Sequence, residues 1–102
     1  LEPYKQLYYN ILIYRTPLKF IAQSIKYPTD AQEAGVQGRV ICSFVVDKKG
    51  NIVEPKIIRG IDPSLDAEAL RVIGMMPRWT PGRQDGKAVR VLYTVPITFR
   101  LQ

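Results

Sequence analysis

The strongest constraint in this chain is the alternation of side chains near its carboxyl end. Over residues 89–101 every second residue is apolar, and most residues between them are polar or charged. Successive side chains of a β-strand point to opposite faces, so a period of two predicts a long strand with one buried face. The inward set is Val89, Val91, Tyr93, Val95, Ile97, Phe99 and Leu101.

A second segment with the same period begins at Gln37. One face carries the apolar set Val40, Cys42, Phe44 and Val46. Residues 47–51 (DKKGN) have the composition of a hairpin turn, in which Gly50 supplies the positive φ. Residues 52–59 return as another strand, which must be bulged or at a sheet edge at Pro55, because proline cannot donate to a ladder.

Two segments have helical patterns. The first begins with Thr16 as cap and Pro17 at the first helical position, and Pro28 ends it. Its predicted apolar stripe is Leu18, Ile21 and Ile25. Thr29 and Gln32 match a capping box for one more short turn, which Gly35 ends.

The second helix begins at Asp62-Pro63 and ends before Pro77. Its predicted apolar stripe is Leu65, Ala69, Val72 and Met76. We interpret Met75 and Met76 as core filler. Residues 81–87 (PGRQDGK) are predicted to form a loop.

The fold class that follows is α+β. Two helices pack on one face of a small three-stranded antiparallel sheet, in the order helix, strand, strand, helix, strand. This domain covers residues 17–102, and residues 1–16 form a flank or an extra strand. Residues 7–14 (LYYNILIY) fit a covered strand, a helix begun by Pro3, or a flank that orders against a partner.

The same pattern predicts the core. We expect burial of Val40, Phe44, Leu70 or Val72, Trp79 and Phe99 around one sheet-helix interface. The single cysteine, Cys42, lies in an apolar strand, and we expect it to be a buried and unreactive thiol.

The sequence contains none of the familiar motifs for catalysis. There is no histidine, and no metal-ligand spacing, glycine-rich phosphate loop or catalytic triad is visible. We therefore expect no enzyme, no metal and no cofactor. No apolar run approaches the length of about 18 residues that a membrane-spanning helix needs.

The charge leaves one alternative open. The net charge is +6, with a basic cluster of Arg78, Arg83, Lys87 and Arg90. A basic patch can bind nucleic acid, but aromatic stacking residues are not interleaved with this one. We favour a solvated face or a surface that faces an acidic partner.

With these elements placed, the sequence resembles a known family. The motifs, in order, are YP at residues 27–28, GVQGRV, FVVDKKGNI, RGIDPSLDAEALRVI, MPRWTPG and GKAVRVLYTVPITFRL. This succession resembles the C-terminal domain of TonB, in the form common in Bacteroidetes, over residues 18–101. Several motifs in the right order are far more specific than any single one.

The resemblance implies a function. Such domains belong to periplasmic energy transducers that are tethered to the inner membrane by an N-terminal segment. They bind the TonB box of TonB-dependent outer-membrane transporters, and a complex with ExbB and ExbD supplies the pull from the proton gradient for nutrient uptake. The chain begins at Leu1 and not at methionine, which fits an excised piece of such a protein.

Two other functions remain open. A TonB-like domain attached to a BlaR-type membrane metallopeptidase would act as a periplasmic sensor or adaptor. A basic nucleic-acid module is the less favoured reading. The sequence upstream of Leu1 would separate the first from a transducer.

A small sheet with a free edge is suited to peptide binding by strand addition, which needs no catalytic residue. We expect the long carboxyl-terminal strand to be this edge, with Arg90, Arg100 and Pro96 limiting self-pairing. The predicted peptide-binding residues are Tyr27, Pro28, Arg90, Val91, Leu92, Tyr93, Thr94 and Val95. Residues 7–14 are the competing occupant, either within the chain or exchanged from a second copy in a homodimer.

Overall fold

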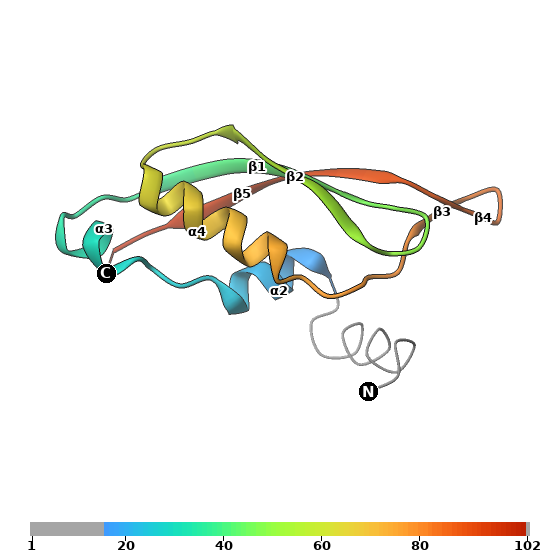
Figure 1. Ribbon diagram of the computed structural model, residues 1–102, viewed down its shortest axis with the longest axis horizontal. Coiled ribbons are helices and arrows are strands. Elements are labelled where there is room, and N and C mark those ends of the chain that lie inside the picture. The colour runs from blue at the N-terminus through green and yellow to red at the C-terminus, as the bar shows by residue number, and fades with distance from the viewer. Residues whose placement is uncertain (1–15, 102) are drawn as a thin grey trace.

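The computed structural model describes residues 16–101, and its elements follow the expected order (Figure 1). They are α2 (Pro17–Ser24), α3 (Thr29–Glu33), β1 (Gly38–Val46), β2 (Ile52–Arg59), α4 (Pro63–Gly74), β3 (Gly82–Gln84), β4 (Lys87–Val89) and β5 (Val91–Phe99). The α+β prediction is therefore confirmed. The interpretation of residues 7–14 lies outside the described residues.

The main sheet has the strand order β2-β1-β5, and both pairings are antiparallel. Helices α2 and α4 lie on the same side of this sheet, as Figure 1 shows. Strand β1 pairs with β5 without any register shift, from Gly38 opposite Phe99 to Val46 opposite Val91. The pairing of β1 with β2 contains two register shifts. The two edges of the sheet thus differ in regularity.

The core lies between the sheet and the helices. Its members include Val40, Phe44, Val72, Trp79 and Phe99, each at most 4% exposed, as the sequence predicts. Of the two alternatives predicted for the core, Val72 is correct and Leu70 is wrong, because Leu70 is 37% exposed on the outer side of α4. Cys42 is fully buried.

Helix α2 faces the core through Phe20 and Ile21, while Leu18 is 49% exposed. The predicted stripe was therefore rotated, because Phe20 and not Leu18 supplies the large buried side chain. Thr16 is the N-cap and accepts a hydrogen bond from the Lys19 amide at 3.2 Å. The helix ends at Ser24, earlier than Pro28 predicts, because Ile25 already adopts an extended conformation with ψ 137°.

Two further details differ from the sequence expectations. Pro28 is the N-cap of α3, with no side-chain hydrogen bond, so Thr29 lies inside the helix and the capping-box prediction is wrong. Met76 is buried, but Met75 is 51% exposed because it follows the end of α4 on the solvent side.

The segment predicted as a loop is a hairpin. Strands β3 and β4 pair from Gly82 opposite Val89 to Gln84 opposite Lys87. The two residues between them, Asp85 and Gly86, both have positive φ, at 53° and 78°. An Asp-Gly pair with this geometry is the preferred two-residue hairpin turn. The Asp-Gly pair was the sequence signal for the hairpin.

The predicted turn after β1 is confirmed and is fixed by a distant segment. Gly50 has φ +86°, and its carbonyl accepts a hydrogen bond from the Trp79 amide at 2.8 Å. A Cβ atom at Gly50 would lie 2.0 Å from the Trp79 carbonyl oxygen, so no other residue fits without moving the backbone. The turn and the chain after α4 are therefore held together.

Candidate functional site

Strand β5 forms a regular and unpaired edge of the sheet. It pairs with β1 on one flank, and within residues 16–101 no strand pairs with its other flank. The opposite edge, β2, is less suited to pairing. Both edge strands contain a proline without an amide donor, Pro55 in β2 and Pro96 in β5, but β2 also has Glu54 with φ 53°, and its pairing with β1 is shifted twice. Strand β5 is therefore the edge that a further strand can join.

The predicted site residues 91–95 lie on this edge strand. Leu92 is 66% exposed and, like Thr94, points away from the helices. Tyr93 points inward, and its ring stacks on Phe44 with the centroids 5.3 Å apart. Val95 is buried. A partner would therefore meet the backbone of this segment and the outward side chains, not the Tyr93 ring.

Arg90 lies between β4 and β5, and its guanidinium forms an ion pair with Glu54 of β2. Both side chains are more than half exposed, so this pair contributes little to stability. Its effect is on the local charge, because the Glu54 carboxylate neutralises the positive charge of Arg90 at this end of β5.

Tyr27 and Pro28 lie at the other end of β5. The Tyr27 ring packs edge-on against Phe99 at 5.5 Å, and its hydroxyl donates to the Val36 carbonyl. At about 3.3 Å per residue, Phe99 is about 20 Å from Tyr93 along the strand. The structure thus does not bring Tyr27 together with residues 90–95, because the chain after α2 leads to the start of β1, which pairs with the end of β5.

An apolar groove runs between α2 and β5, and the sequence pattern does not indicate it. Its volume is about 400 Å³, and it is lined by Leu18, Ile21, Ala22 and Ile25 of the helical side and by Val95, Pro96, Ile97 and Thr98 of the strand. The groove therefore lies directly beside the unpaired flank of β5. The predicted stripe places Leu18 in the core, whereas Leu18 lines this groove. Phe20 in the same helix is the sequence signal for the correct rotation.

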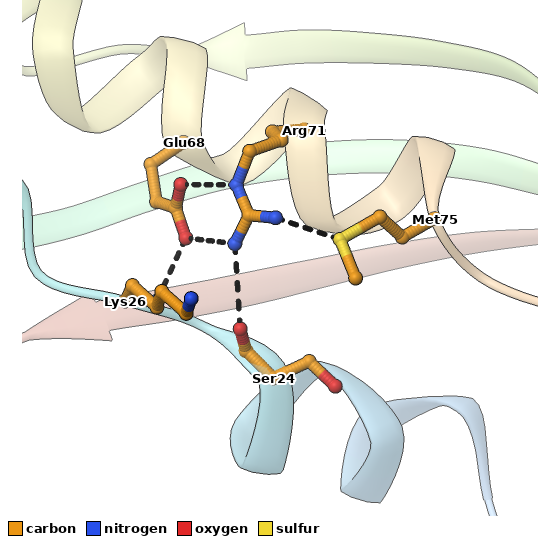
Figure 2. A network of polar contacts seen from close by, with 5 residues as sticks. All are labelled: Ser24, Lys26, Glu68, Arg71 and Met75. Atoms are coloured by element: carbon orange, nitrogen blue, oxygen red, sulfur yellow. Dashed lines mark hydrogen bonds and ion pairs between the residues drawn. The ribbon is translucent and has the colours of Figure 1, made fainter.

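A polar network fixes the carboxyl end of α2, which forms one wall of the groove (Figure 2). The Glu68 carboxylate accepts hydrogen bonds from the Lys26 amide at 2.7 Å and from the Arg71 guanidinium at 2.6 and 2.8 Å. Arg71 also reaches the Ser24 carbonyl at 3.5 Å. The hydrogen bond from Arg71 holds the pKa of Glu68 below its ordinary value. The network thus ties α2 to α4.

Within residues 16–101, the side chains around this edge form no metal-binding group and hold no activated thiol. Burial raises the pKa of the Cys42 thiol to about 11, which disfavours the nucleophilic thiolate. Within residues 16–101 no three His, Cys, Asp or Glu side chains gather as a metal-binding group. Among the helices described, none has the length and apolar character needed to cross a membrane.

Within residues 16–101, the sheet, its one-sided helical layer and its regular β5 edge define the class of the molecule: a small α+β domain. The chain belongs to the family described as Gram-negative bacterial TonB protein C-terminal, whose profile matches residues 23–101. It is therefore a TonB-type periplasmic domain, from a family that is related to transport and is not enzymatic.

Solved structures show the same fold. The Helicobacter pylori TonB C-terminal domain (residues 179–285) is similar with a TM-score of 0.68 and 22% identity, over 95% of this chain and 82% of that one. The TonB2 protein of Vibrio anguillarum is similar with a TM-score of 0.53 and 26% identity, over 76% of each chain. No curated protein sequence matches the chain.

Proposed function

We propose that this domain binds the TonB box of TonB-dependent outer-membrane transporters by adding the box as a strand to β5. It is a binding module with no catalytic role of its own. In the parent protein it is tethered to the inner membrane by an N-terminal segment and works with ExbB and ExbD, which transmit the energy of the proton gradient for nutrient uptake.

The single observation that carries this proposal is the regular flank of β5, with which no strand within residues 16–101 pairs. Nine residues of β5 pair with β1 without a shift, so the backbone of β5 has the even geometry that a further strand needs. Strand addition takes its affinity from main-chain hydrogen bonds. The β2 edge, with two register shifts and a positive φ at Glu54, offers a less regular ladder.

The test is an amide chemical-shift titration of the full chain with a TonB-box peptide from a transporter of the same organism. We expect the largest shifts at the non-proline amides of β5, with smaller ones in β1 and none concentrated in β2. Shifts confined to the helices would refute the proposal.

Two N-methylated peptides give the matched control. In an added strand, alternate amides point to the sheet edge and the others point away. Methyl groups on one set of alternate amides should abolish binding, and methyl groups on the other set should leave it nearly intact. Equal affinity of the two peptides would mean that main-chain hydrogen bonds between the peptide and β5 do not contribute to binding.

A further inference from the structure

The groove beside β5 lies where the side chains of an added strand would point. Val95 and Ile97 face inward, toward the helices, and are buried. Residues of a guest strand that lie opposite them point to the same side of the sheet. On that side the groove is lined by Leu18, Ala22 and Ile25. The inward side chains of a guest would therefore contact α2.

The surface that α2 offers there is apolar and accessible. Leu18 is 49% exposed, Ala22 is also exposed, and Ile25 is half-buried. The network of Glu68 and Arg71 holds the carboxyl end of this helix against α4, so the wall is fixed before any guest arrives. A fixed apolar wall favours apolar guest residues, since their contact surfaces leave water together.

The outward side of the same edge is positively charged at one end only. Arg39 of β1 lies opposite Thr98, and Arg100 follows directly after β5; both line one hollow of about 480 Å³. Both side chains are exposed, and within residues 16–101 neither forms an ion pair. Arg90 at the other end is paired with Glu54. An acidic guest residue is therefore matched beside Arg100, not beside Arg90.

We propose that the β5 edge selects the sequence of an added strand through the side chains of that strand. Alternate guest residues that face α2 are apolar and fill the groove beside Leu18, Ala22 and Ile25, and an outward acidic residue lies next to Arg100, with Arg39 one strand further into the sheet. This specificity rests on the proposed strand addition to β5. Its occupant is an extended segment of a partner protein with this alternating pattern.

The first experiment measures binding of a synthetic peptide of nine residues, the length of β5. The peptide carries valine at alternate positions, threonine between them and glutamate at one end. Its Kd for the full chain is compared with that for Leu18→Glu and for the control Leu70→Glu, an exposed leucine on α4. We expect Leu18→Glu to weaken binding about tenfold or more and Leu70→Glu to change it less than twofold.

Leu18 is half exposed, so the Leu18→Glu chain is expected to fold, and its amide spectrum checks this. Should that variant unfold, Leu18→Gln takes its place and Leu18→Met serves as the variant that retains binding. A peptide with threonine in place of every valine should bind the wild type as weakly as the valine peptide binds Leu18→Glu.

The second experiment concerns the charge. Arg39→Gln with Arg100→Gln is compared with Lys48→Gln with Lys49→Gln, which removes the same charge from the β1–β2 turn. Replacing the peptide glutamate by glutamine should weaken binding to the wild type and to the lysine variant about threefold, and should have no effect on the arginine variant.

The outcomes separate the two proposals. If no peptide shifts the β5 amides, strand addition itself is refuted and the groove has no guest strand to read. If the β5 amides shift but Leu18→Glu binds within twofold of the wild type, the groove reading is wrong while strand addition stands. A glutamate effect that persists in the arginine variant overturns the charge assignment.

Discussion

The deepest test of the core is the removal of its single tryptophan, Trp79→Ala. Trp79 is 4% exposed, and it follows α4 where the chain returns toward the β1–β2 turn. A buried tryptophan removes roughly 200 Å² of surface from water. At about 25 cal/mol per Å² this corresponds to about 5 kcal/mol, within the range of about 3–5 kcal/mol measured for such truncations.

That loss is large for a domain of this size. A chain of 102 residues is expected to have an unfolding free energy of about 5–15 kcal/mol. With a urea m-value of about 1.5 kcal/mol/M, a loss of about 4 kcal/mol lowers the unfolding midpoint by more than 2 M. A wild type near the lower end of the range would leave the variant only marginally folded at 25 °C.

Urea unfolding followed by far-UV circular dichroism measures this, because Trp79→Ala removes the only tryptophan and with it the tryptophan fluorescence signal. The control is Leu70→Ala on the exposed side of α4, which should change the unfolding free energy by less than about 1 kcal/mol. If Trp79→Ala lowered the unfolding free energy by no more than Leu70→Ala, the indole would contribute nothing as a core residue and the reasoning would be refuted.

Three other predictions follow from single contacts. Cys42 should not react with a thiol reagent in the native state at pH 8, because it is fully buried and its pKa is raised to about 11; rapid labelling without denaturant contradicts this. The pKa of Glu68 is lowered in the folded state. The ionised carboxylate therefore stabilises the fold at a pH above its ordinary pKa of 4.5, and this stabilisation is lost as the pH falls through the pKa of the folded state. The difference in urea midpoint between wild type and Glu68→Gln should therefore shrink as the pH is lowered from 6 to 3. A difference that stays constant would show that the ionised carboxylate does not stabilise the folded state. Gly50→Ala should lower the midpoint strongly, since its Cβ would meet the Trp79 carbonyl, while Gly74→Ala, which meets nothing within 4 Å, should not; equal effects would refute the contact.

Regular periodicity made much of this fold predictable from the sequence. The alternation in residues 37–46 and 89–101 identified the face that packs on the helices, where Val40, Phe44, Val95 and Phe99 are buried. In β1 the opposite face is covered as well, since Ser43 and Val45 are at most 8% exposed. Proline and glycine were equally informative where they act locally, as at Pro17, Pro63 and Gly50.

The candidate site was less predictable, because it depends on how distant segments meet. The rotation of α2 places Leu18 or Phe20 inward, and both choices satisfy a helical period. Tyr27 and Arg90 are each adjacent to the last strand, but only the register of β1 with β5 shows that they lie near opposite ends of it. The hydrogen bonds from the Lys26 amide to Glu68 and from Arg71 to the Ser24 carbonyl also join segments more than 40 residues apart in sequence.

The contrast between the two sheet edges also limits self-association. Growth of a filament by edge pairing needs two different competent edges on every copy, one for each neighbour. Among the strands of residues 16–101, the shifted register and the positive φ at Glu54 impair β2, and β5 is the regular edge. Two copies that meet through β5 use the same surface twice, related by a two-fold axis, and leave no second regular edge. Pairing of this kind therefore stops at a closed dimer.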